Sequence, residues 1–343
     1  MTIKSHDYSV YHPAEAFPLE QGGVIPNPVI AYHTYGTLNA QRDNVILICH
    51  ALTANSDVED WWQGLFGKGN LFDPDRWFII CANNLGSPYG TSSPKQVNAQ
   101  TQERYGMDFP FFTIRDTARL HLKLLEHLEI SCIKLLIGGS CGGNICQEIA
   151  HEWGERIENM VLLCCSSREP PWSIAIHEAQ RIALHADPTL PLKKENAGQA
   201  GLKACRAAAL PFYRTHGSFE LRQTESDLDK MQDFRASSYI DYQGDKFVNR
   251  FDAHCYYGLL NALDTHNMGR GRQSIEQALS RIKAKTVVIG FDTDILIPVT
   301  EQQFLARHIP QSSYVEIKTL FGHDAFLIET DDIRDSIRTK INI

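Results

Sequence analysis

The chain has 343 residues, 43% of them hydrophobic and 22% charged, which is enough for one large α/β domain with an insertion or for two domains. Its formal net charge of −8 and its lack of any basic stripe exclude the surface that nucleic acids or anionic membranes require. No apolar run approaches the roughly 18 residues of a membrane span, and residues 1–8 hold no signal-peptide core. We expect a cytoplasmic protein without a membrane or nucleic-acid partner.

Short apolar runs alternate with amphipathic segments through the first half of the chain and again near its end. Such runs predict parallel strands that are covered on both faces. Strands are expected at residues 29–35, 45–49, 77–81, 134–137, 160–164, 286–290 and 314–317, and helices at 114–127 and 145–153. The alternation predicts an α/β fold with a mostly parallel, doubly covered sheet.

The alternation stops between residues 168 and 281, where the sequence becomes helical and polar and contains no convincing strand. Pro170 and Pro171 mark the entry to this segment. An insertion between two sheet strands lies over the carboxyl ends of the strands. We therefore expect a core of residues 1–167 and 282–343, and a helical lid of residues 168–281.

The most informative motif is a Gly-x-Ser-x-Gly sequence centred on Ser140, between an apolar strand and a helical segment. A serine on a tight strand-to-helix turn needs small neighbours, and Gly138 and Gly142 provide them. The helix that follows directs backbone N–H groups at the position where an oxyanion forms. This pattern predicts a nucleophile elbow with Ser140 as the nucleophile.

A serine nucleophile needs a base and an acid that orients the base, and in this kind of sheet they follow in the order serine, acid, histidine. The strand at 286–290 runs into a loop that contains Asp292 and Asp294, so either could be the acid. The next strand is followed by His323, next to a glycine that lets the loop turn inward. Order and spacing predict a triad of Ser140, one of these two aspartates and His323.

Two backbone N–H groups are expected to form the oxyanion hole. One belongs to Cys141, directly after the nucleophile, and the other to Leu52, in the loop after the strand at 45–49. The nine cysteines form no Cys-x-x-Cys zinc motif, and most lie in apolar segments. We interpret them as reduced, mostly buried thiols, and we expect no metal.

Nearly the whole chain resembles the homoserine O-acetyltransferase family, acyltransferases of methionine biosynthesis with the α/β-hydrolase fold. The motifs include CHALT at 49–53, GGSCGG at 138–143 and GHDAF at 322–326. Further matching stretches, in chain order, are 61–62, 72–76, 105–106, 108–110, 113–116, 250–253, 294–298 and 314–316. The resemblance places the triad on Ser140, Asp294 and His323, and so favours Asp294 over Asp292.

The resemblance also implies an amino-acid site and a homodimer formed through lid helices. In the family, an arginine, a tyrosine and the acid after the catalytic histidine bind the substrate, and these positions match Arg206, Tyr213 and Asp324. A guanidinium suits the carboxylate of homoserine, and a carboxylate suits its ammonium. The alternative is that Arg206 and Tyr213 only pack a lid helix and that Asp324 only caps its loop.

Two departures from the family pattern leave the acyl group open. Cys141 stands where methionine or leucine is usual, and residues 85–94 lack the usual double glycine and cysteine. We expect both changes near the acyl pocket. The donor could therefore be acetyl-CoA, succinyl-CoA or another short acyl-CoA.

The predicted reaction is a ping-pong acyl transfer from acetyl-CoA to L-homoserine through acyl-Ser140, with acyl-CoA as a substrate and no bound cofactor. The alternatives are succinyl-CoA as donor, L-serine as acceptor, and an esterase or thioesterase that uses water. A catalytically inactive fold retained as a binding module is the alternative from another class.

Overall fold

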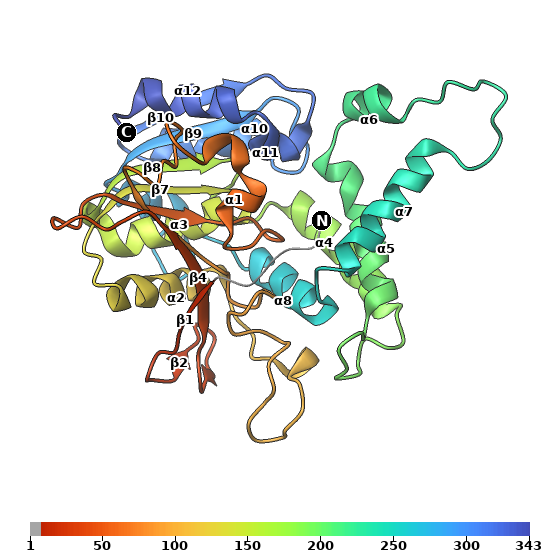
Figure 1. The fold of residues 1–343 in the computed structure, drawn as a ribbon, viewed down its shortest axis with the longest axis horizontal. Helices are drawn as coiled ribbons and strands as arrows, with labels where there is room; N and C mark the ends of the chain where they lie inside the picture. Colours follow the sequence, from red (N-terminus) through yellow and green to blue (C-terminus); the bar gives the residue numbers. More distant parts are fainter. Residues whose placement is uncertain (1–7) are drawn as a thin grey trace.

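A mostly parallel sheet of eight strands forms the centre of the computed structural model, which describes residues 8–343 (Figure 1). The strand order is β1-β4-β6-β5-β7-β8-β9-β10. The strands are β1 (Ser9–Tyr11), β4 (Ile30–Tyr35), β5 (Val45–Cys49), β6 (Phe78–Ala82), β7 (Ile133–Gly139), β8 (Ile157–Leu163), β9 (Lys285–Phe291) and β10 (Ser312–Ile317), and β2 (Phe17–Pro18) and β3 (Val24–Ile25) form a separate hairpin. The predicted doubly covered α/β sheet is confirmed. Residues 1–7, most of the stretch expected to lack a signal-peptide core, lie outside the described residues.

Strand β4 is antiparallel to its neighbours β1 and β6, unlike the strands from β6 to β10. Only residues 36–44 join β4 to β5, whereas a parallel connection needs about a dozen residues or more. The short connection thus accounts for the direction of β4. The far end of β4 is only partly buried, as an antiparallel edge allows.

Helices cover both faces of the sheet, and side chains alternate between two cores. Along β5, Val45, Leu47 and Cys49 belong to one core, while Ile46 and Ile48 belong to the other. The first core is completed by α2 (Ile114–His127), α3 (Cys141–Trp153) and α10 (Val299–His308), and the second by α1 (Val58–Trp61), α11 (Ala325–Ile328) and α12 (Thr330–Lys340). Short 3-10 helices lie at η1 (Gln63–Leu65), η2 (Gly106–Asp108), η3 (Gly154–Arg156) and η4 (Gly322–Asp324). The sheet therefore holds the ends of its central strands rigidly.

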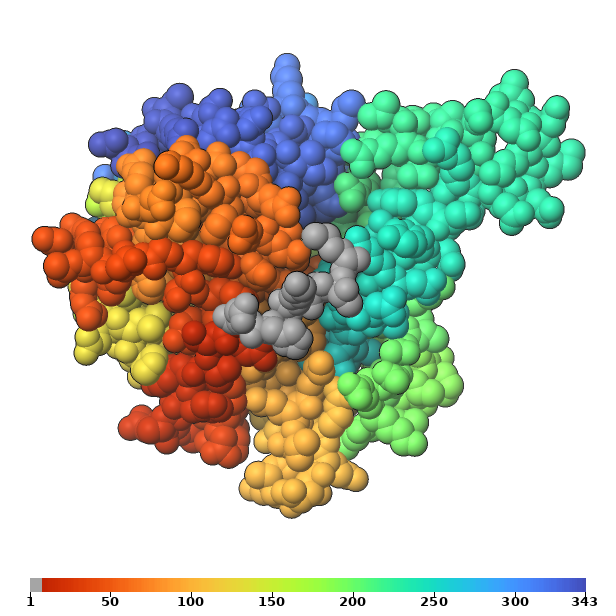
Figure 2. Space-filling model, in the orientation of Figure 1, coloured from red at the N-terminus to blue at the C-terminus, as the bar shows by residue number. Residues whose placement is uncertain are grey.

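The segment between β8 and β9 is helical and projects from the sheet (Figures 1 and 2). It contains α4 (Pro171–His185), α5 (Gln199–Tyr213), α6 (His216–Gln223), α7 (Arg235–Val248) and α8 (Ala253–Asp264). A further helix, α9 (Ile275–Ser280), lies in the range expected for the lid but contacts α3 and α10 of the core. No helix within residues 8–343 has the length and apolar character needed to cross a membrane.

A largely buried ion-pair network joins α2, α3 and the segment after α8. Glu148 Oε2 lies 3.1 Å from Arg115 Nε and 2.6 Å from Arg272 Nη2. Glu20 pairs with Arg115 and, at 2.8 Å, with Arg270. Burial alone would raise the pKa of Glu148, but hydrogen bonds and charges from the two arginines lower it overall. The network thus fastens the exit of the lid segment to the core.

Replacing Glu148 by glutamine is expected to lower the free energy of unfolding by about 3 to 5 kcal/mol, because it leaves the poorly solvated Arg272 guanidinium without a counter-charge and Arg115 with Glu20 alone. Denaturant unfolding followed by circular dichroism measures the change. The control is Glu126→Gln, whose pair with Lys123 leaves both side chains more than half exposed and should matter by less than about 0.5 kcal/mol. Equal effects for the two variants would show that the network contributes no special stability.

Candidate active site

Ser140 lies at the sharp turn between β7 and α3, with φ 55° and ψ −127°. This backbone conformation is unusual for a residue with a side chain, and the surrounding structure must hold it. A Cβ atom on Gly142 would lie 2.0 Å from the Cys49 carbonyl oxygen, and one on Gly138 would lie 2.4 Å from the Gly142 backbone. The close crossing of α3 over β5 and β7 therefore requires both glycines and presents Ser140 at the end of the strand.

Ser140, His323 and Asp294 are joined by hydrogen bonds. His323 Nε2 lies 2.9 Å from Ser140 Oγ, and His323 Nδ1 lies 2.7 Å from Asp294 Oδ2. The other carboxylate oxygen of Asp294 accepts hydrogen bonds from the backbone N–H groups of Leu296 and Ile297. The base is thus within reach of the serine proton, and its far nitrogen is fixed by a buried carboxylate.

Asp292, the alternative acid, has a different partner. Its carboxylate accepts a hydrogen bond from the backbone N–H of Thr319 at 2.9 Å and thereby holds the loop that follows β10. The structure brings Asp294 to the histidine, in agreement with the choice that the family resemblance favours.

The predicted oxyanion-hole residues lie beside Ser140 and line the same cavity. Within residues 8–343, the backbone N–H groups of Leu52 and Cys141 donate no hydrogen bond to another protein group. Cys141 is the first residue of α3, so its N–H is one of the free donors at a helix N-terminus. Both groups are available for an oxyanion formed on an acyl group at Ser140.

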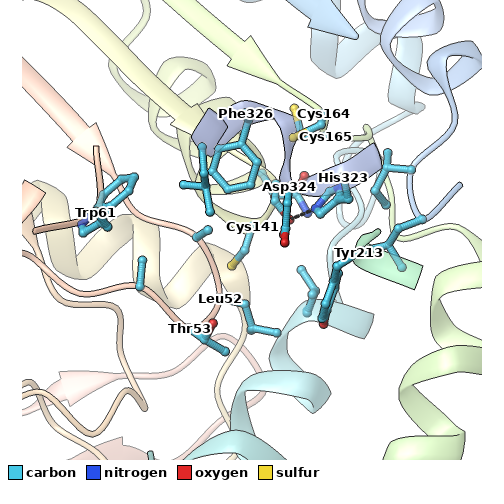
Figure 3. A pocket seen from close by; sticks show the side chains of 18 of the residues that line it. Leu52, Thr53, Trp61, Cys141, Cys164, Cys165, Tyr213, His323, Asp324 and Phe326 are labelled. Carbon is cyan, nitrogen blue, oxygen red and sulfur yellow. Dashed lines mark hydrogen bonds between the residues drawn. The ribbon is translucent and has the colours of Figure 1, made fainter. Parts of the chain in front are cut away.

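A cavity of about 400 Å³ opens at Ser140 between the sheet and the lid. Its lining includes the three predicted substrate residues, Arg206, Tyr213 and Asp324. Figure 3 shows Asp324 and Tyr213 facing the same space as His323, with Cys141 and Leu52 across from them. The Arg206 guanidinium carbon lies 5.4 Å from the centre of the Tyr213 ring, and within residues 8–343 no carboxylate pairs with it. The cavity therefore places an unpaired cation and a carboxylate next to the nucleophile.

Comparisons with known proteins agree with this geometry. Residues 44–330 match a family model described as the alpha/beta hydrolase fold. A homoserine O-acetyltransferase from Cyclobacterium marinum is 41% identical over 325 residues, which covers 95% of this chain and 92% of the relative. The chain belongs to the homoserine O-acetyltransferase family.

Two solved structures superpose on nearly the whole chain. The homoserine O-acetyltransferase from Bacillus anthracis has a TM-score of 0.89 and 25% identity, covering 98% of both chains. A mutant of esterase E22 has a TM-score of 0.88 and 25% identity, covering 97% of this chain and 98% of its own. The same fold thus occurs in a transferase and in an esterase. The choice between an amino-acid hydroxyl and water as the acceptor must therefore come from the residues of the cavity.

His50 positions the oxyanion loop, the loop after β5 that carries the Leu52 donor. The sequence analysis did not assign this role. Its Nδ1–H donates to the Ala51 carbonyl at 2.8 Å, and its Nε2 accepts from the Asn84 backbone N–H at 3.0 Å. Burial lowers the pKa of His50 to about 3, so the ring is neutral. Because the C=O of Ala51 and the N–H of Leu52 belong to one planar peptide and point in opposite directions, holding the carbonyl fixes the direction of the Leu52 donor.

We expect His50→Ala to lower kcat by about 10- to 100-fold, because one oxyanion donor loses its fixed direction. The KM for the amino-acid acceptor should change little, since His50 does not line the cavity. Steady-state kinetics of the variant report on the orientation of the Leu52 donor, and thermal unfolding reports on the contribution of His50 to stability. A lower melting temperature with unchanged kcat would mean that His50 serves stability alone.

The environment of His323 predicts a pH dependence for acylation. Burial lowers the pKa of His323, but the charge and hydrogen bond of Asp294 and the charge of Asp324 together raise it above its usual value. The base accepts a proton only when neutral, so acylation should increase as the pH rises through this elevated pKa. Removing the Asp324 charge should lower the pKa of His323, and the acidic limb of the pH profile, where the acylation rate rises, should then move to lower pH.

The measurement is the pH profile of the acylation burst with p-nitrophenyl acetate, which needs no amino-acid acceptor. Asp324→Asn should shift the acidic limb downward, whereas Asp332→Asn, on the exposed face of α12, should leave it in place. An identical limb in the wild type and in Asp324→Asn would contradict the prediction.

Several cavity residues carry polar groups that the sequence analysis missed. Glu169 is almost fully buried, and burial together with the charge of Asp264 raises its pKa well above the usual value. His177 Nδ1 lies 2.6 Å from Asp264. Arg250 donates to the Thr53 carbonyl at 2.6 Å and thereby joins the lid to the oxyanion loop. These contacts join residues far apart in the chain, and no local motif indicates them.

Residues 85–94, one of the two departures from the family pattern, are not part of the cavity lining. Instead they brace β4: Ser92 Oγ accepts from the Val29 N–H, and Thr91 Oγ1 accepts from the Ala31 N–H. Their link to the site is indirect and runs through Tyr89, which accepts a hydrogen bond from Arg250. Of the two departures, Cys141 is the one that lines the cavity.

One group of side chains has metal-ligating atoms close together. Cys164 Sγ, an Asp294 oxygen and a His323 ring nitrogen all lie within 4.8 Å of one another. Two of these residues already form the buried acid–base pair, and burial raises the pKa of Cys164 well above the usual value, so its thiol is neutral. We interpret Cys164 as apolar support for the acid.

Proposed function

We propose that this chain transfers the acetyl group of acetyl-CoA to the hydroxyl of L-homoserine, within methionine biosynthesis. The observation that carries the proposal is the combination of a Ser140–His323–Asp294 arrangement with an unpaired arginine and a carboxylate in one cavity. An esterase that uses water has no need of a site for a zwitterion. The names of the relatives support the same choice of reaction.

The first half of the reaction forms an acyl-enzyme. His323 takes the proton of Ser140 as its oxygen attacks the thioester carbonyl, and Asp294 stabilises the imidazolium that results. The N–H groups of Leu52 and Cys141 stabilise the oxyanion. The tetrahedral intermediate collapses with loss of CoA thiolate, which receives the proton from His323. The thioester carries the activated acyl group, so the reaction as proposed needs no resident cofactor.

The second half transfers the acetyl group to the acceptor. His323 removes the proton of the homoserine hydroxyl, whose oxygen attacks acetyl-Ser140, and the proton then returns to Ser140 as the ester product leaves. Arg206 and Tyr213 bind the carboxylate of homoserine, and Asp324 binds its ammonium. These contacts hold the homoserine hydroxyl next to acetyl-Ser140, at the position from which water would otherwise attack.

The test measures consumption of acetyl-CoA and succinyl-CoA by the purified protein with L-homoserine, L-serine or water as acceptor. Loss of thioester absorbance is the suitable signal, because thiol reagents would also react with accessible cysteines among the nine free ones. Homoserine-dependent consumption of acetyl-CoA is expected. Faster reaction with succinyl-CoA or with serine would reassign the donor or the acceptor, and equal consumption without any amino acid would identify a thioesterase.

We further propose a cytoplasmic homodimer formed through the lid. The segment around α6 and α7 exposes large apolar side chains, as expected of an interaction surface. They are Leu221 (69% exposed), Leu228 (96%), Met231 (90%), Phe234 (42%) and Tyr242 (60%). Sedimentation velocity tests the dimer, and Met231→Glu should shift it toward monomer.

A further inference from the structure

Arg214, at the end of α5, forms an ion pair with Asp324 in the active-site cavity. Arg214 Nε lies 3.0 Å from Asp324 Oδ2, and both side chains are about four-fifths buried, at 20% and 18% exposure. Both residues line the cavity. Among the described residues that line it, no other arginine or lysine pairs with a carboxylate. Asp324, the predicted ammonium partner, therefore has a cation beside it before any substrate binds.

The position of Arg214 is fixed by the packing of the lid against the loop after β10, which carries His323 and Asp324. Gly322 has φ +62°, and a Cβ atom there would lie 3.2 Å from the Arg214 carbonyl group. Next to it, the Thr215 hydroxyl donates to the Leu320 carbonyl. The chain at Arg214 is thus fastened directly to the loop that carries His323 and Asp324, so the ion pair is a built feature of the cavity.

The Arg214 guanidinium retains unused hydrogen-bond donors. Its Nε is buried and has no hydrogen-bond partner within the described residues, because the N–H is not directed at Asp324 despite the short distance. Its two Nη groups also donate to no residue in the described part of the chain. Buried donors without a partner are costly, and a bound ligand can supply the missing acceptor.

An α-amino acid carries its carboxylate and its ammonium on the same carbon atom. A site for it must therefore present a cation to the carboxylate and, beside it, an anion to the ammonium. Arg214 and Asp324 have this arrangement, whereas Arg206 lies over the rings of Tyr213 and Phe247, 5.4 Å from each. The ion pair therefore matches the charged end of the proposed acceptor.

We propose that Arg214 is a specificity-determining residue that binds the α-carboxylate of the amino-acid acceptor together with Arg206, while Asp324 binds the ammonium. This inference rests on the proposed function. A guanidinium can hold a carboxylate with two parallel hydrogen bonds, which gives direction as well as affinity. Arg214 thus selects acceptors that carry a carboxylate next to the amine.

The test compares L-homoserine with L-homoserine amide, which keeps the hydroxyl and the ammonium but replaces the carboxylate with a neutral group. For Arg214→Gln, kcat/KM with homoserine should fall by about 10- to 100-fold, as expected for a lost charged hydrogen bond. With the amide it should fall by no more than about threefold. Arg214→Lys keeps the charge but not the fork, and should recover part of the loss with homoserine.

The matched control is Arg222→Gln. Arg222 is exposed on α6 and stacks over Phe321 of the same loop, with its guanidinium carbon 5.6 Å from the ring centre, but it does not line the cavity. It should behave as the wild type with both acceptors. The acetylation burst with p-nitrophenyl acetate, taken on the pH plateau, should be the same in all variants and shows that the triad is intact.

The outcomes separate the two proposals. If the wild type shows no homoserine-dependent consumption of acetyl-CoA, the proposed function fails before any variant is made. If the wild type uses homoserine but Arg214→Gln loses kcat/KM equally with both acceptors, Arg214 only supports the loop and the inference is wrong. An unchanged kcat/KM with homoserine would also overturn it.

Discussion

Replacing Ser140 by alanine is expected to lower the rate of acyl transfer by a factor on the order of 10⁴ or more. The hydroxyl of Ser140 lies 2.9 Å from His323 Nε2, so its proton is the one that the base is placed to remove. Substrate should still bind, because the cavity walls are unchanged. Mass spectrometry after incubation with acetyl-CoA provides a direct check: the wild type should gain one acetyl group, and the variant none.

Ser167→Ala is the matched control for this experiment. Ser167 is also a buried serine just beyond the end of a strand, but it is not part of the cavity lining. Its replacement should leave the rate within about threefold of the wild type. Acetylation and turnover that persist in Ser140→Ala would assign the chemistry to another nucleophile or would favour a binding module over an enzyme.

Asp294→Asn is expected to lower kcat by about 10⁴-fold while leaving the fold intact. The carboxylate of Asp294 accepts hydrogen bonds at both oxygens, from two backbone N–H groups on one side and from His323 on the other. An asparagine has one acceptor oxygen and one donor nitrogen. If its oxygen serves the backbone, its NH₂ faces His323 Nδ1, and the ring must then carry its proton on Nε2, where it cannot accept the serine proton.

The control for the acid is Asp292→Asn, two residues away in the same loop. Asp292 accepts one backbone hydrogen bond from Thr319, which an asparagine oxygen can also accept. Its kcat should therefore stay within about tenfold of the wild type. A larger loss for Asp292→Asn than for Asp294→Asn, measured by steady-state kinetics, would reverse the assignment of the acid.

Much of the framework follows from local sequence patterns. All seven predicted strands and both predicted core helices are present with small shifts at their ends, because buried strands and amphipathic helices leave regular apolar patterns in the chain. The antiparallel direction of β4 was also within reach, since the connection of residues 36–44 is too short for a parallel crossover. The sequence order of nucleophile, acid and base predicted which residues meet at the strand ends.

The residues that bind the amino-acid substrate were harder to predict from the sequence. Arg206, Tyr213 and Asp324 came from the family resemblance, and the structure places all three at one cavity, where their roles stay predictions. Spacing along the chain also could not show that residues 85–94 brace β4 and reach the cavity only indirectly, through the contact of Tyr89 with the lining residue Arg250.

By itself, then, the sequence determined the sheet, the elbow glycines around Ser140 and the strand ends that carry Asp294 and His323, because each depends on residues that are near neighbours in the chain. Only the tertiary structure decided that the Asn84 N–H holds the His50 ring, which in turn orients the Leu52 peptide, and that Arg214 pairs with Asp324. These contacts join segments that are brought together by packing of the lid and loops on the sheet. No periodicity or local motif records such a partner, since its position depends on the fold of everything between.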